Sequence, residues 1–160
     1  MKAQSGFTLV ELMVVVAIIG IVLAIATMNF TQWNDKYTVE SYTKEIYSIL
    51  MKARNDAANT NTQNLVTLAA NQVQVTQDDN GNGVVDPGEP TTTNPFPRFA
   101  IQFAISPIVF DRRGIANVVV NQTIRITGYS PNASPGVDCI VVAKTRINMG
   151  VMTGGACVQQ

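Results

Sequence analysis

The feature that most constrains this chain is a long apolar stretch near its N terminus that contains one acid. Residues 12–26 carry no polar side chain, and apolar character extends over residues 7–28 with only Thr8, Glu11 and Thr27 as interruptions. This length matches the roughly 20 residues that a helix needs to span a bilayer. A carboxylate deep in a bilayer costs about 2.5–3.5 kcal/mol on insertion scales, so Glu11 is expected to have a partner.

The chain itself offers a partner for this acid. If the bond after Gly6 is cut, Phe7 gains a free α-amine one helical turn before Glu11, at positions i and i+4. The amine of the same chain or of a neighbouring chain would then neutralise the carboxylate. Gly6, Phe7 and Glu11 are therefore the candidate processing and assembly residues.

Residues 6–11, Gly-Phe-Thr-Leu-Val-Glu, end a short leader that contains Lys2 and resemble the N terminus of type IV pilins and type II secretion pseudopilins. In that family a prepilin peptidase cuts after the glycine and usually methylates the new N-terminal residue, here Phe7. The resemblance implies that residues 1–6 are a leader peptide and that Glu11 acts in filament assembly. It also implies other pilins, the prepilin peptidase and an inner-membrane assembly machinery with its ATPase as partners. The expected location is the bacterial inner membrane, as a single-pass protein, and then a periplasmic or extracellular filament.

Two simpler interpretations of the N terminus stay open. Residues 1–26 fit an ordinary secretory signal in which residues 24–26, Ala-Ile-Ala, form the cleavage site. Glu11 would interrupt the apolar region of such a signal. An uncleaved membrane anchor is the second interpretation, and it leaves both Glu11 and the junction after Gly6 unexplained.

Composition narrows the classes of function. The formal net charge is zero and the chain contains no histidine. A zero net charge does not favour electrostatic capture of nucleic acid. The lack of histidine removes the usual general base and the commonest transition-metal ligand. No nucleophile elbow, phosphate-binding glycine loop or His-x-x-His motif is present, so we do not expect an enzyme.

The only two cysteines, Cys139 and Cys157, lie in the last quarter of the chain. Outside the reducing cytosol, behind a membrane-targeting segment, an isolated pair is most simply a disulfide. Closing this loop would stabilise the fold by about 3 kcal/mol on the loop-entropy estimate. Two free buried thiols are the alternative, and a metal site would need a third ligand.

Helical periodicity continues beyond the apolar stretch. Apolar residues recur at spacings of three and four through Val39, Ile46 and Ala57. We expect one helix over about residues 7–58, with a transmembrane or filament-core part at 7–30 and an amphipathic half at 31–60.

From residue 61 the period changes to two and turn residues recur, which is typical of short antiparallel strands. The predicted fold class is therefore α+β and pilin-like, with a long N-terminal helix packed on a C-terminal antiparallel β-sheet head over residues 61–160. Strands are predicted at 65–68, 73–75, 99–105, 108–110, 118–120, 123–126 and 139–142, and a loop at 91–95. Alternate residues of the third strand are expected to face the helix; they are Phe99, Ile101, Phe103 and Ile105.

The order of elements narrows the resemblance. An Ala-rich helix end at residues 52–58, a pair of strands, and a hydrophobic strand that enters Phe-Asp-Arg-Arg-Gly at 110–114 look like the FimT/GspH branch of pseudopilins and minor pilins. The long insertion around residues 77–97 departs from a compact head of that kind.

Residues 78–89 within this insertion fit the twelve-residue calcium template D-x-[DN]-x-[DN]-G-x5-E at every specified position. Gly83 permits the sharp turn that brings the ligand oxygens together. Pro87 and Pro90 exclude the helix that usually follows such a loop, so we expect a structural Ca²⁺ site between strands. A disordered turn rich in Asn and Gly is the alternative. The expected ligands are Asp78, Asn80, Asn82, the Val84 carbonyl, Asp86 and a bidentate Glu89.

Two functions from different classes follow. The leading one is a structural subunit, a minor pilin or pseudopilin, of a type IV pilus or a type II secretion pseudopilus. The alternative is a membrane-anchored binding module at a filament tip, either an adhesin or a DNA-uptake subunit. Nucleic acid would then bind a basic patch, which linear order alone does not establish, made of Arg112, Arg113, Arg125, Lys144 and Arg146.

Overall fold

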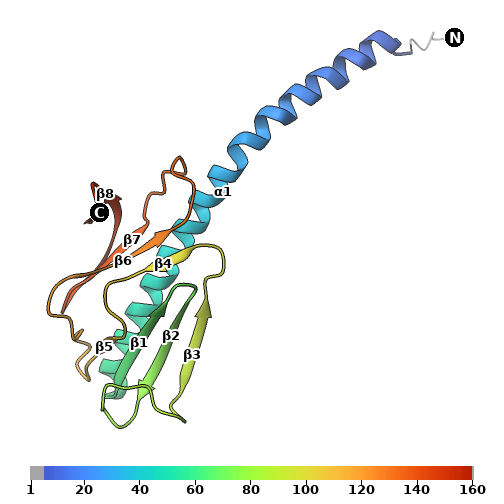
Figure 1. The fold of residues 1–160 in the computed structure, drawn as a ribbon. Coiled ribbons are helices and arrows are strands. Elements are labelled where there is room, and N and C mark those ends of the chain that lie inside the picture. Colours follow the sequence, from blue (N-terminus) through green and yellow to red (C-terminus); the bar gives the residue numbers. More distant parts are fainter. Residues whose placement is uncertain (1–5, 160) are drawn as a thin grey trace.

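A single long helix leads into a β-rich head (Figure 1). The structure is a computed structural model that describes residues 6–159, apart from the side chains of residues 25–29. Helix α1 (Leu9–Thr60) has 52 residues. Thr8 caps its N terminus, and the C-cap residue Asn61 adopts the left-handed conformation with φ 53°. The predicted helix is therefore confirmed, with each end two residues further along the chain.

Two antiparallel sheets form the head. The first sheet has the order β3-β2-β1-β5 and the second the order β4-β6-β7-β8-β9. The strands of the first sheet are β1 (Gln63–Ala69), β2 (Gln72–Asp78), β3 (Thr91–Pro95) and β5 (Ile108–Phe110). Those of the second are β4 (Ala100–Gln102), β6 (Gln122–Thr127), β7 (Cys139–Val142), β8 (Ile147–Thr153) and β9 (Ala156–Gln159).

The core lies between the C-terminal half of α1 and the two sheets. The helix contributes one apolar stripe, since Val39, Ile46, Leu50, Ala53 and Ala57 are buried at spacings of three, four and seven residues. Burial of each large apolar side chain contributes about 1.5–3 kcal/mol. The sheets complete the same cluster with side chains that include Val66, Val73, Phe110, Ile124 and Ile140. The α+β class with a helix packed on an antiparallel head is confirmed.

Three strand predictions need correction. Residues 91–95, predicted as a loop, form β3 and pair with β2 from Thr76 to Gln72, because β-branched threonines suit an edge strand. Residues 118–120, predicted as a strand, form a turn in which Val118 N bonds to Ala116 O and Val119 is 90% exposed. The sequence pattern also missed β8 and β9.

The third correction concerns the segment predicted as a strand at 99–105. Only Ala100–Gln102 pairs, with β6. The Ser106 hydroxyl then contacts both the amide and the carbonyl of Leu68, which brings the chain across to β5. Phe99 and Ile101 are buried as predicted, but Ile105 is exposed and does not face the helix.

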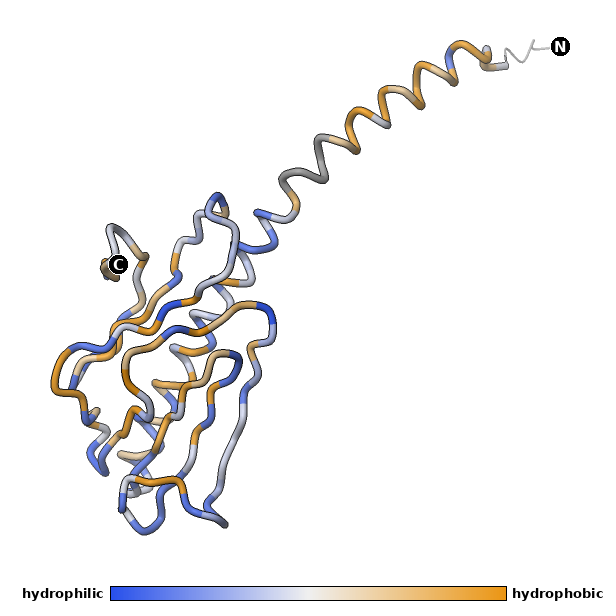
Figure 2. Tube along the Cα trace, in the orientation of Figure 1, coloured by the Kyte–Doolittle hydropathy of each residue, from blue (hydrophilic) through white to orange (hydrophobic). Residues whose placement is uncertain are grey.

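The N-terminal half of α1 projects away from the head (Figure 1), and most of its described residues are hydrophobic (Figure 2). From Phe7 to Leu23 its large apolar side chains are 48–85% exposed. Within the residues that the structure describes, we find no helical segment whose length and hydropathy would allow it to cross a membrane.

Candidate functional site

The predicted processing junction lies at the tip of the projecting helix. Gly6 and Phe7 precede the helix and are exposed, and a methyl group added at Gly6 would meet no atom within 4 Å. Residues 1–5 of the predicted leader lie outside the described residues. Within the described residues, both sides of the predicted cleavage junction are therefore exposed.

Glu11 lies in the first turn of α1. Its backbone amide donates to Thr8 Oγ1 at 3.3 Å, and Leu12 N donates to Thr8 O at 3.2 Å. Thr8 thus acts as the N-cap, and Glu11 lies where an acid is favoured by the helix dipole. Phe7, Glu11, Leu12 and Val15 line an open pocket of about 210 Å³. The acid and the residue whose amine would be freed therefore border one hollow in an apolar surface.

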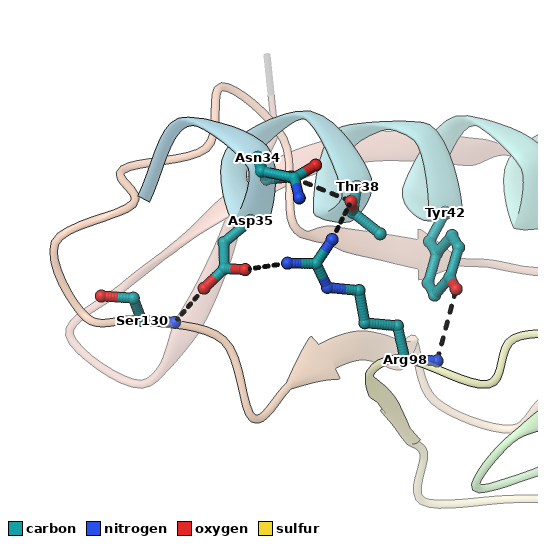
Figure 3. A network of polar contacts seen from close by, with 6 residues as sticks. All are labelled: Asn34, Asp35, Thr38, Tyr42, Arg98 and Ser130. Atoms are coloured by element: carbon teal, nitrogen blue, oxygen red, sulfur yellow. Dashed lines mark hydrogen bonds and ion pairs between the residues drawn. The ribbon is translucent and has the colours of Figure 1, made fainter. Parts of the chain in front are cut away.

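A polar network, which sequence reasoning missed, joins the helix to the head where α1 leaves it (Figure 3). Arg98 Nη2 lies 2.6 Å from Asp35 Oδ1, and Arg98 Nη1 donates to Thr38 Oγ1. The other Asp35 oxygen accepts from the amide of Ser130 at 3.2 Å. We call Asp35, Thr38, Arg98 and Ser130 the neck clasp. It ties two separate loops of the head to one helical turn.

Glu40 is a second acid of α1 that contacts the head, in the loop after β6 that also contains Ser130. Glu40 Oε1 accepts from Gly136 N at 2.8 Å, and its other oxygen lies 3.7 Å from Lys44 Nζ. The spacing of Glu40 and Lys44 predicts their pairing, but no local pattern points to partners in the head that are almost a hundred residues away.

The predicted disulfide between Cys139 and Cys157 is confirmed and joins β7 to β9. Asp138, next to the first cysteine, is buried and accepts from Tyr129 Oη at 2.6 Å and from Met152 N at 2.7 Å. Burial raises the pKa of Tyr129, and the hydrogen bond to Asp138 raises it further. The C-terminal hairpin is thus fixed by one covalent bridge and one buried acid.

The predicted calcium loop joins β2 to β3. Asp78 is buried as the last residue of β2, whereas Asn80 and Asn82 are exposed. Asp86 and Glu89 are half-buried and adjacent, since Glu89 Oε2 accepts from Asp86 N at 2.9 Å. Among the described residues, no three His, Cys, Asp or Glu side chains form a metal-binding group. Three of the six template ligands, Asp78, Asp86 and Glu89, are of these residue types, so their carboxylates are not gathered at metal-binding distances in this structure.

The five basic residues considered for a nucleic-acid patch fall into different surroundings. Arg125 Nε donates to Gln102 Oε1 at 2.7 Å, in a pocket of about 310 Å³ bordered by β4, β6 and the β8–β9 hairpin. Lys144 borders another pocket, of about 320 Å³, which shares no lining residue with the first. Its carbonyl accepts from Ala116 N, which brings the turn before β8 close to the segment after β5.

The two arginines at 112–113 are also separated in their contacts. Arg113 pairs with Asp111 at 3.0 Å, whereas Arg112 lies beside the β2–β3 loop, where its Nη2 would be 3.4 Å from a methyl group added at Gly81. Burial raises the pKa of Asp111, but the amides of Ile115 and Arg113 and the Arg113 guanidinium outweigh it and hold that pKa below its usual value. Arg113 and Lys144 are linked only indirectly, because Asp111, the partner of Arg113, lines the same pocket as Lys144, whereas Arg125 lines a different pocket.

Comparison with known proteins gives matches to both halves of the chain. Residues 1–27 match the prokaryotic N-terminal methylation motif, and residues 43–145 match the family of type II transport protein GspH. Two fimbrial proteins of Pseudomonas aeruginosa are each 30% identical to the chain over 154 residues, which cover 84% of this chain and 96% of the relative. No solved structure shows significant similarity. The chain therefore belongs to the GspH family, carries the prepilin-type methylation motif and is a pilin or pseudopilin subunit.

Proposed function

We propose that this chain is a minor structural subunit of a type IV pilus or a type II secretion pseudopilus, and that its precursor is cut between Gly6 and Phe7. In this proposal a prepilin peptidase removes residues 1–6 and methylates the new Phe7 amine. Residues 7–30 then hold the subunit in the inner membrane and later form the filament core. Residues 31–60 connect this segment to the head over 61–160, which faces the periplasm or the exterior.

The observation that carries this proposal is the exposed apolar half of α1. Large apolar side chains from Phe7 to Leu23 are exposed, whereas the stripe from Val39 to Ala57 is buried under the head. A continuous apolar surface of this kind needs either lipid or other helices around it. A precursor in a membrane and a subunit in a helical filament core supply these two environments in turn.

Glu11 gives that surface its specificity. Two unit charges at 4 Å attract by roughly 4 kcal/mol at an effective dielectric constant of about 20. This attraction is similar in size to the roughly 2.5–3.5 kcal/mol that burying the acid costs on insertion scales, so pairing offsets part of the cost of burying the two charges. Glu11 is therefore stable among apolar helices only when a cation such as the freed Phe7 amine lies beside it. Helix packing that places Glu11 beside a Phe7 amine would be favoured over packing in which the helices are shifted along each other.

Two substitutions test the proposal in cells that assemble the filament. Gly6→Ala should leave the precursor uncut, which intact-mass measurement of the purified protein reports. Glu11→Gln should be cut and methylated normally but should enter sheared filaments at least about tenfold less, as a loss of about 1.4 kcal/mol predicts. Glu45→Gln removes an exposed acid from the same helix and is the matched control, which should assemble as the wild type does. Filaments built normally from uncut Gly6→Ala protein, or from Glu11→Gln protein, would refute the proposal.

A further inference from the structure

The loop between β2 and β3 has a geometry that the filament function leaves unused. Its two ends are joined at the sheet, since Gln77 N donates to Pro90 O at 3.0 Å. The loop lies at the end of the head away from the N terminus (Figure 1). It therefore starts and ends on a rigid support.

Asp78 organises the first half of the loop. One carboxylate oxygen accepts from Gly81 N at 2.6 Å and Asn82 N at 3.3 Å, and the other accepts from Gly83 N at 2.7 Å. The turn requires φ values of +73° at Gly81 and +79° at Gly83, which residues with side chains rarely adopt. The glycine that the calcium template demands at position six is therefore used as a turn residue.

The next template positions continue this winding. Asn80 Oδ1 accepts from Asn82 N at 2.9 Å, and Asn82 Oδ1 accepts from Val84 N at 2.8 Å. The amide nitrogens of both asparagines then donate to Asp86 Oδ2, each at 2.7 Å. Template positions three, five and nine therefore already meet at one oxygen atom.

The last template position has an atom without a protein partner. Glu89 Oε2 bonds to Asp86 N, but Glu89 Oε1 is buried from solvent and accepts no hydrogen bond. A buried carboxylate oxygen without a donor is costly, so it points to a ligand that the protein does not itself supply.

The charge of the loop also indicates a ligand that the protein does not itself supply. Residues 78–89 contain four carboxylates, those of Asp78, Asp79, Asp86 and Glu89. Three ion pairs occur among the described residues, and none of them involves this loop. Arg112 lies beside Gly81 but forms no ion pair with these acids. The loop therefore concentrates negative charge that a divalent cation would neutralise.

We propose that the β2–β3 loop binds one Ca²⁺ per chain. Rotation of the Asn80 and Asn82 amides by about 180° exchanges their nitrogens for oxygens at Asp86. It gives up their hydrogen bonds to Asn82 N and Val84 N, and bonds to the cation replace these contacts. Glu89 Oε1 then completes a bidentate carboxylate. Ca²⁺ accepts six to eight oxygens in flexible geometry, whereas Mg²⁺ demands a smaller octahedron and retains its waters, so this loop suits Ca²⁺. The ligands are Asp78, Asn80, Asn82, the Val84 carbonyl, Asp86 and Glu89.

Calcium titration of the full-length protein in detergent, after removal of divalent ions by chelation, tests the proposal. Isothermal titration calorimetry should give about one site per chain with a dissociation constant near 10⁻⁴–10⁻³ M, the range of extracellular calcium modules. A calcium concentration of about 10 mM should then shift the folded-to-unfolded ratio by about 10- to 100-fold. The same titration with magnesium should give at most weak binding.

Two variants that each remove one negative charge distinguish a specific calcium site from diffuse electrostatic attraction. Glu89→Gln should weaken calcium binding at least about tenfold, since loss even of outer partners of metal ligands costs 10–100-fold. Asp79→Asn removes the same charge from an exposed position that the template does not use, and it should bind within about twofold of the wild type.

The outcomes are distinct. Asp86→Asn serves as the ligand variant if circular dichroism shows that Glu89→Gln does not fold without calcium. No binding by the wild type at 10 mM calcium, equal losses in Asp79→Asn and Glu89→Gln, or equal affinity for magnesium would each overturn the proposal. None of these results would bear on cleavage after Gly6 or on assembly through Glu11.

Discussion

At the scale of single residues, Gly150 explains how the disulfide spans the second sheet. Gly150 on β8 pairs with Cys139 of β7 on one side and with Gln159 of β9 on the other. Strands two apart in a flat sheet are separated by roughly 10 Å. The Cα atoms of Cys139 and Cys157 are only 6.0 Å apart, so the sheet curls sharply across β8.

The absence of a side chain at Gly150 permits this curl. A Cβ atom there would overlap the carbonyl oxygen of Val158 and lie 3.0 Å from Cys157 Sγ. Because the overlap is with backbone, no rotamer change relieves it. Gly150→Ala should therefore destabilise the head by about 3 kcal/mol, at the upper end of overpacking costs. Thermal unfolding of the full-length protein in detergent measures this change.

A glycine in the same hairpin is the control. Gly154 has φ 59° and open space around its Cβ position, so Gly154→Ala should cost only about 1 kcal/mol for the left-handed conformation. Alkylation of free thiols gives a second comparison, since Gly150→Ala should leave part of the protein without the bridge and Gly154→Ala should not. Equal stability and full bridging in both variants would contradict the role assigned to Gly150.

The two cysteines and Gly150 show what local sequence does and does not predict at this scale. A lone cysteine pair behind a targeting segment has few alternatives to a disulfide, so the number of cysteines alone predicted this bond. The need for glycine at 150 arises from the carbonyl of Val158 on another strand. No pattern around Gly150 carries that information.

At the scale of elements, the neck clasp decides how the head is held on the helix. Asp35 uses both carboxylate oxygens, one for Arg98 on the loop before β4 and one for the Ser130 amide on the loop after β6. Asp35 is 15% exposed and Arg98 38% exposed, so solvent screens this ion pair less than an open surface pair. The Asp35–Arg98 pair should therefore stabilise the fold by more than a fully exposed salt bridge does.

Asp35→Asn should lower the free energy of unfolding by about 1.5–2 kcal/mol, because hydrogen bonds to a charged group are the strong ones. Amide hydrogen exchange should accelerate over residues 128–138, where the loop loses its anchor. Lys44→Ala removes an exposed helix pair and should cost only about 0.3–0.5 kcal/mol, without changing that exchange. If the two variants behaved alike by both measurements, the clasp would have no special role.

The strands show why pattern-based prediction succeeded in part. Alternating β-branched runs such as Thr123 to Ile126 predict β6, because a half-buried strand needs that alternation. Thr91 to Pro95 lacks it, since β3 is an edge strand whose side chains are mostly exposed. Val118 to Val120 has strand composition, but Val118 is buried in a turn and the next two valines are exposed. Contacts with the rest of the fold decide whether such short segments form strands.

The β2–β3 loop is the opposite case, because the calcium template that it matches specifies spacing and residue type together. Sequence predicts which side chains meet, and the contacts of Asn80 and Asn82 with Asp86 agree with that spacing. The orientation of the amides and the orphan oxygen of Glu89 are visible only in the structure.

At the scale of the whole molecule, the two halves of α1 serve separate needs. Among the described residues, every helix residue in the buried core lies at or after Val39. The described apolar side chains before Ala24 are exposed, and the neck clasp begins at Asp35. The head therefore packs on the second half of the helix, while the described apolar side chains of the first half remain exposed.

A chain that starts at residue 31 should accordingly retain the head. Its helix keeps both Asp35 and the stripe from Val39 to Ala57, and it loses none of the described core. We expect it to purify without detergent, to form the Cys139–Cys157 bridge and to unfold cooperatively within about 2–4 °C of the full-length protein, a shift that corresponds to about 1 kcal/mol. A chain that starts at residue 45 is the control, since it lacks Asp35, Val39 and Glu40, and it should unfold at a much lower temperature or without cooperativity. Near-ultraviolet circular dichroism on heating distinguishes the cases. A truncated head from residue 31 with no cooperative transition would mean that the projecting segment stabilises the head, and the division of the molecule near residue 30 would be wrong.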